Sequence, residues 1–128
     1  MFNLRIITLA ATLAGSSAAL AVAPLASAKS GPGVRVQGTC TGHSTTNIKL
    51  KSEDGRIEVE FQVDQNRNGV PWKVTLRRNG SRVASTTATT HAPSGSFSLR
   101  RVIAGVHGTV LAVATRSSGE RCTAKARI

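Results

Sequence analysis

The sequence predicts an all-β protein, built as a single antiparallel β-sandwich of seven or eight short strands. After residue 28, apolar and polar residues alternate with the period-two pattern of half-buried strands. This part of the sequence has no helical periodicity that lasts for more than one turn. Pairs of Gly, Asn, Asp and Ser separate these segments at short intervals. Short, evenly spaced strands are typical of a sandwich, immunoglobulin-like in the broad sense, and a small closed β-barrel is the alternative.

Residues 1–28 have the features of a secretory signal peptide. Arg5 precedes a long apolar run, and Ala26 and Ala28 have the small side chains that a signal peptidase accepts, so we expect cleavage after Ala28. No second long apolar segment follows. The sequence therefore predicts a secreted, extracellular protein, with no integral membrane segment once the signal is removed.

The mature chain is expected to begin with a flexible leader at 29–33, KSGPG, and to continue as one sandwich domain over 34–128. Val34 opens the first strand, and Gly38 within it predicts a bulge or a close backbone approach.

The clearest structural signal is a β-hairpin around Asp54-Gly55. This dipeptide favours a two-residue turn, and the segment 57–64 after it alternates strictly between apolar and polar residues. The predicted facing pairs are Glu53 with Arg56, Lys51 with Glu58, Lys49 with Glu60, Leu50 with Val59, and Ile48 with Phe61. Every charge then faces its opposite, and a one-residue slip would bury the charges.

Asn79-Gly80 predicts a second hairpin of the same kind. Its predicted facing pairs are Leu76 with Val83, Lys73 with Thr86, and Arg77 with Arg82. Here like charges face each other, and Arg78 adds a third guanidinium beside the turn.

The C-terminal third is expected to add strands at 96–101, 109–117 and 120–128. The alternation breaks at Arg100-Arg101, which predicts a bulge or a strand end there.

Two cysteines, Cys40 and Cys122, remain in the predicted mature chain. In an exported protein they are expected to form a disulfide that ties the first mature strand to the last. A catalytic thiol is the alternative.

The formal net charge is +11, and removal of Arg5 with the signal peptide lowers it to +10. Such a charge favours an extracellular polyanion as partner, such as nucleic acid, a cell-wall polymer or acidic lipid. The candidate anion-binding residues are Arg77, Arg78 and Arg82, which Arg100 and Arg101 can join. The alternative is a solvated basic face that aids solubility. The aromatic residues of the predicted mature chain, Phe61, Trp72 and Phe97, all have core positions in the predicted strands, so stacking on bases or sugars is not expected.

The segment Asp64–Gly69, DQNRNG, matches the start of a calcium loop, but Thr75 stands where such a loop needs a bidentate Glu. An Asx-rich turn is expected instead, with weak calcium binding as the alternative. His43, His91 and His107 lack metal-ligand spacing, and no nucleophile elbow occurs. We predict no metal, no cofactor and no enzymatic activity.

Three segments carry a resemblance to a known group. They are EFQVDQNRNGVPWKVTLRRNG at 60–80, THAPSGSF at 90–97, and the Gly-Glu-x-Cys element at 119–122. With these, the chain resembles a group of small exported actinobacterial proteins. The resemblance implies an export signal, one disulfide and a β-sandwich, and it implies no activity.

The segment SGSFSLRR at 94–101 is also similar to the neocarzinostatin-type chromophore carriers, although their two disulfides are not matched. We therefore expect a monomeric, non-enzymatic surface-binding module, with small-molecule carriage as the alternative.

Overall fold

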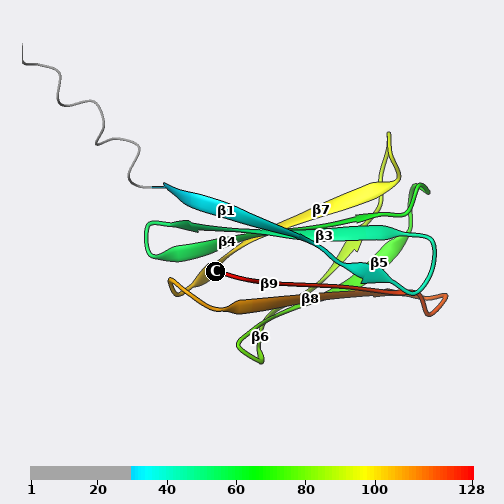
Figure 1. Cartoon of the computed structure of the whole chain (residues 1–128). Coiled ribbons are helices and arrows are strands. Elements are labelled where there is room, and N and C mark those ends of the chain that lie inside the picture. The colour runs from blue at the N-terminus through cyan, green and yellow to red at the C-terminus, as the bar shows by residue number, and fades with distance from the viewer. Residues whose placement is uncertain (1–29) are drawn as a thin grey trace, which may run out of the picture.

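The structure is a computed structural model that describes residues 30–128, with side chains from residue 33 onward. The predicted signal peptide at 1–28 and Lys29 lie outside the described residues. Two antiparallel sheets pack face to face (Figure 1). The four-stranded sheet has the order β1 (Ser30–Gln37), β3 (Thr45–Glu53), β4 (Arg56–Asp64) and β7 (Ser96–Ala104). The five-stranded sheet has the order β2 (Thr39–Cys40), β9 (Arg121–Arg127), β8 (Thr109–Arg116), β5 (Pro71–Arg78) and β6 (Ser81–Thr89).

The predicted sandwich is confirmed, and the alternative of a closed barrel is wrong. Within residues 30–128 every ladder joins strands of the same sheet, so the two sheets remain separate layers. The described part of the chain forms nine strand segments rather than seven or eight, because the first predicted strand is divided in two.

Gly38 divides that strand. Its N–H donates to the Thr46 carbonyl at 2.9 Å, next to the four-stranded sheet, and the two residues after it pair with β9 in the other sheet. A Cβ at this position would collide with the carbonyl oxygen of Thr123 and with the side chains of Ala124 and Thr46. The predicted close approach is confirmed, and only glycine allows the chain to cross between the layers here.

The structure also differs from the expected leader. β1 begins at Ser30 rather than at Val34, so 30–33 are part of the strand. Pairing with β3 continues through an irregularity between Ser30 and Gly33, because β3 extends as far as Glu53 and provides an edge for these residues.

The first hairpin has the predicted register at every pair, from Glu53 opposite Arg56 to Ile48 opposite Phe61. Asp54 and Gly55 both have positive φ, as a two-residue turn of this kind requires.

The second hairpin matches the prediction only near its turn. Arg77 faces Arg82 as predicted, but a register shift follows, so that Leu76 faces Ala84 and Lys73 faces Thr87. Val83 is the extra residue of this bulge, and 41% of its surface is exposed.

The break predicted at Arg100-Arg101 is wrong. β7 runs through both residues to Ala104 and pairs with β4 without a shift. Arg101 lies opposite the buried Val59, in the inward phase, yet it is exposed because β7 is an edge strand. An edge strand leaves a long side chain a path to solvent, so the alternation breaks without a break in the strand.

The period-two alternation places one face of each central strand in a continuous core. Trp72 on β5 packs against Phe97 on β7 with ring centroids 6.4 Å apart, and Phe61 on β4 meets Phe97 at 6.1 Å. The other fully buried large side chains are Ile48, Leu50, Ile57, Val59, Val63, Val74, Leu76 and Val110. β8 and β9 contribute mainly alanines to the core, which leaves room for the aromatic side chains.

Candidate functional site

The predicted disulfide joins Cys40 on β2 to Cys122 on β9. The two residues face each other directly in the β2–β9 ladder, and Cys122 is buried. The bridge spans 82 residues of sequence and fixes the short strand β2 to the five-stranded sheet. Both sulfurs are in the bond, so the alternative of a catalytic thiol is wrong for this form of the protein.

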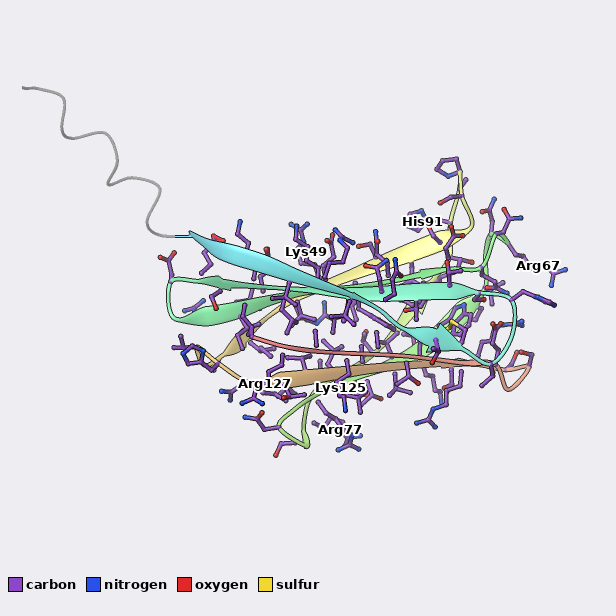
Figure 2. The ribbon with its side chains drawn as sticks, viewed as in Figure 1. Lys49, Arg67, Arg77, His91, Lys125 and Arg127 are labelled. Atoms are coloured by element: carbon purple, nitrogen blue, oxygen red, sulfur yellow. A yellow bond between two sulfur atoms is a disulfide. The ribbon has the colours of Figure 1, made fainter. Side chains whose placement is uncertain are left out.

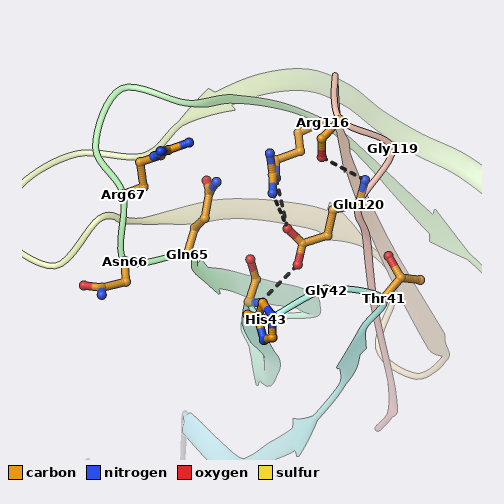
Figure 3. Close-up of a pocket in the computed structure, with 11 residues that line it drawn as sticks. Thr41, Gly42, His43, Gln65, Asn66, Arg67, Arg116, Gly119 and Glu120 are labelled. Carbon is orange, nitrogen blue, oxygen red and sulfur yellow. Dashed lines mark hydrogen bonds and ion pairs between the residues drawn. The ribbon is translucent and has the colours of Figure 1, made fainter.

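A polar pocket of about 590 Å³ opens at one end of the sandwich, beside the disulfide (Figure 3). The loops after β2, β4 and β8 surround it. Its lining includes Thr41, Gly42, His43, Ser44, Gln65, Asn66, Arg67, Arg116, Ser118, Gly119 and Glu120.

Glu120 is the buried group of this pocket. One carboxylate oxygen accepts from Nε and Nη2 of Arg116, both at 2.9 Å, and the other accepts from the backbone N–H of Ser44 at 3.1 Å (Figure 3). Burial raises the pKa of Glu120, but these hydrogen bonds lower it more, so its pKa lies below the ordinary value. Glu120 is therefore a carboxylate that holds the β2–β3 loop against the β8–β9 turn.

Arg116 is also committed to structure. Its guanidinium carbon lies 5.6 Å from the centroid of the Trp72 ring, over the edge of the core, while its nitrogens bind Glu120. Glu120 and Arg116 thus neutralise each other, and Arg67 is a second cation in the lining of the pocket.

The loop Asp64–Gly69 uses its polar groups in backbone hydrogen bonds. Asp64 accepts from the N–H of Asn66 at 3.1 Å, which is the geometry of an Asx turn, and the N–H groups of Gln65 and Asn66 donate to the Gly95 carbonyl. The Thr90 hydroxyl donates to the Arg67 carbonyl. The predicted Asx-rich turn is confirmed.

One metal-type cluster occurs among the described residues, formed by Cys40, Cys122 and Glu120. Its two sulfurs form the disulfide and its carboxylate binds Arg116, so these groups are not free to bind a metal. His43, His91 and His107 lie in three separate loops, as the sequence predicts.

The structure brings together only part of the predicted arginine group. Arg77 and Arg82 face each other at the surface of the five-stranded sheet. Arg78 instead folds over the β7–β8 loop, where it packs against Gly105 and Gly108 and its Nη2 donates to the His107 carbonyl at 2.8 Å. Arg78 is half-buried, and it holds this loop in place.

Arg100 and Arg101 do not join Arg77 and Arg82, because β7 belongs to the other sheet. Arg100 pairs there with Glu60 at 3.2 Å and with Glu58 at 3.8 Å.

The outer surface of the five-stranded sheet carries a larger basic patch, which we call the cationic face. Figure 2 labels three of its residues, Arg77, Lys125 and Arg127. In the alternation of β5 and β9, its side chains point away from the buried Trp72 and Cys122. The face contains Lys73, Arg77, Arg82, Arg121, Lys125 and Arg127, all of them exposed.

Acidic residues are missing from the cationic face. The chain has six Asp and Glu residues. Five of them lie on β3, β4 or the turn between these strands, and the sixth, Glu120, is buried in the pocket. Within residues 30–128, no cation of the face lies within ion-pair distance of a carboxylate.

Sequence reasoning missed four of these six cations, namely Lys73, Arg121, Lys125 and Arg127. A signal was present in β9, because RCTAKAR places three cations in the phase opposite to Cys122 and two alanines. These three cations lie on the same surface as Lys73 and Arg77 only because the strand order is β9–β8–β5, which brings together segments that are distant in sequence.

Comparison of the chain with protein-family models, curated proteins and solved structures finds no match. The resemblance to exported actinobacterial proteins therefore stays a prediction, and what is established is a two-sheet all-β protein with one disulfide. Among the described residues, no helix is long and apolar enough to cross a bilayer.

Proposed function

We propose that the protein is an exported, non-enzymatic binding module whose cationic face binds polyanions. The observation that carries this proposal is the segregation of charge. Six cations share one sheet surface without a carboxylate near them, while the acids of the chain lie elsewhere. A surface of one sign raises the local concentration of ligands of the opposite sign and speeds their association.

Export is supported by two independent features. The N-terminal 28 residues have the pattern of a secretory signal, and the disulfide is a bond that persists in oxidising compartments. An extracellular polyanion, such as nucleic acid or a cell-wall polymer, is the class of partner that the face would meet there.

The pocket favours a binding module over an enzyme. Its most buried ionisable group, Glu120, is held as a carboxylate by Arg116 and Ser44, and a group fixed in this way is a poor general base. All of its lining residues except Gly42 and Gly119 are polar or charged, so this pocket offers few apolar side chains to a carried molecule.

The test compares two triple variants of equal charge on a heparin column. Replacing Arg77, Lys125 and Arg127 by Ser removes three cations from the cationic face. The control replaces Arg35, Lys49 and Lys51 by Ser, on the outer surface of the four-stranded sheet. Cationic contacts to a polyanion release bound counterions, so the loss of three contacts should make the first variant elute at clearly lower salt than the parent protein.

The control should elute close to the parent protein, since its cations lie on the other face. Equal losses in the two variants, with both folded by circular dichroism, would show that net charge alone controls retention and would overturn the proposal.

A further inference from the structure

We infer that the polyanion bound by the cationic face is a nucleic acid duplex, and that the face contacts both of its phosphate chains. This inference rests on the proposed function and adds the class of partner.

Four of the six cations of the face define two rows that cross the strands, and Arg82, which faces Arg77, extends the first row onto β6. In the first row, Arg77 on β5 and Lys125 on β9 flank Leu111 on β8. In the second row, Lys73 on β5 and Arg121 on β9 flank Thr115 on β8 in the same way. We call Lys73, Arg77, Arg121 and Lys125 the corner cations.

A neutral row separates these two rows. It consists of Ser85, Thr75, Val113 and Thr123, which face one another from β6 to β9. The hydroxyl groups in this row can donate hydrogen bonds to phosphate and sugar oxygens, as Ser and Thr commonly do at nucleic acid surfaces.

The spacing of the rows fits two phosphate chains. Lys73 and Arg77 are four residues apart on one strand, which places the rows about 13 Å from each other at about 3.3 Å per residue. The minor groove of B-form DNA is about 6 Å wide between the surfaces of its phosphate chains, so the chain centres, each farther out, lie at a similar separation. Each row can then neutralise one chain, with the neutral row over the groove.

Other polyanionic partners fit this surface less well. Single-stranded nucleic acid binds by stacking on aromatic side chains, and the aromatic residues of the described chain, Phe61, Trp72 and Phe97, are buried. A membrane surface would need a cluster of apolar or aromatic side chains to insert, whereas the face offers Leu111 and Val113, both half-buried, and a single exposed valine, Val83, on β6. Contact with the backbone of a rigid duplex needs cations and hydroxyl groups, and the cationic face provides both.

The experiment measures binding of the purified protein to a short mixed-sequence DNA duplex, one of its single strands, heparin, and vesicles containing phosphatidylserine, each at several salt concentrations. The duplex should bind about tenfold or more tightly than the single strand, with a steeper salt dependence.

Two double variants each remove the two corner cations of one row, and a third is the matched control. Lys73→Ser with Arg121→Ser, or Arg77→Ser with Lys125→Ser, should lower the duplex slope by about 1.8 and bring duplex affinity down to that of the single strand. Arg82→Ser with Arg127→Ser removes two cations from the same face but leaves the corner cations, so the preference for the duplex should remain.

Each contrary result has a separate meaning. Equal affinity for duplex, single strand and heparin would overturn the duplex inference and leave the proposed function in place. Tighter binding to vesicles than to duplex would overturn it in favour of a membrane surface. Absence of binding to all four probes would overturn the proposed function as well.

Discussion

The outer surfaces of the two sheets share one architecture and differ in how their charges are arranged. On the four-stranded sheet, Lys49 and Lys51 face Glu60 and Glu58 across the β3–β4 ladder, and Arg100 on β7 pairs with both glutamates. On the five-stranded sheet, Arg77 faces Arg82 and no acid is near. Since the chain pairs charges on one face, the unpaired charges of the other are not a simple consequence of a basic composition.

This difference also bears on stability. Facing like charges weaken a sheet by about 0.2–1 kcal/mol per pair, so the five-stranded sheet forms against its own repulsion. The disulfide and the buried pair of Glu120 with Arg116 both lie in or beside this sheet, and they offset that repulsion. The two faces should therefore respond differently when these supports or the surface charges are changed.

The largest effect is expected from removing the disulfide. Cys40→Ala with Cys122→Ala should lower the free energy of unfolding by about 4 kcal/mol, because a loop of 82 residues is no longer closed in the unfolded chain. Denaturant unfolding measures the loss. Hydrogen exchange should show β9 losing protection before the β3–β4 hairpin, and an even loss over both sheets would contradict the proposed dependence of the five-stranded sheet on its bridge.

A smaller decrease in the free energy of unfolding is expected for Glu120→Gln. Breaking a fully buried ion pair costs about 3–5 kcal/mol, and about 2 kcal/mol is expected here because 24% of the Arg116 side chain is exposed. The pKa of Glu120 is lower in the folded than in the unfolded protein, so its stabilisation is present above its ordinary pKa of 4.5 and is lost as pH falls below it.

Chemical denaturation at pH 7 and at progressively lower pH tests this assignment. The difference in unfolding free energy between the parent and Glu120→Gln should shrink as the pH falls below 4.5. A difference independent of pH would mean that the ionised carboxylate contributes nothing.

The paired face should be sensitive to a single reversal of charge. Lys51→Glu places like charges opposite each other and should destabilise the protein by about 1 kcal/mol. Adding Glu58→Lys restores an opposite pair and should recover part of that loss, measured as a double-mutant cycle. Additive effects of the two substitutions would show that the facing charges do not interact.

The smallest expected effect on stability comes from replacing a single surface cation by Thr, and its sign should differ between the two faces. Arg77→Thr relieves the repulsion with Arg82 and should raise stability by about 0.3 kcal/mol at low salt, although an exposed hydrogen bond to the Gly80 carbonyl is lost. Lys51→Thr removes an attraction and should lower stability by a similar amount. Thermal unfolding at low and high salt tests both variants, and the same sign in each would remove the electrostatic distinction between the faces.

Sequence reasoning succeeds where the determinants are local. The Asp54-Gly55 turn and the facing charges around it lie within about ten residues, and together they specify a single register. The disulfide was predictable because the chain has two cysteines and a signal-like start.

Sequence reasoning fails where the register or the position of a side chain depends on contacts between distant segments. The bulge at Val83 changes the register of the second hairpin although the turn residues are unchanged. Arg78 looks like a surface cation in sequence, but the β7–β8 loop, which lies nearly thirty residues away, provides the carbonyl that binds it. The cationic face likewise exists only because β8 places β5 and β9 on either side of it.

The crossover at Gly38 also bears on strand exchange between copies of the protein. β1 is the first described strand and lies at a sheet edge, which is the position from which a strand most readily swaps into a second molecule. Cys40 is fixed to β9 only two residues beyond Gly38, and the packed backbone at Gly38 leaves no free linker to act as a hinge. We therefore expect β1 to stay in its own sandwich while the disulfide is intact, and we expect reduction of the bond to favour swapped dimers.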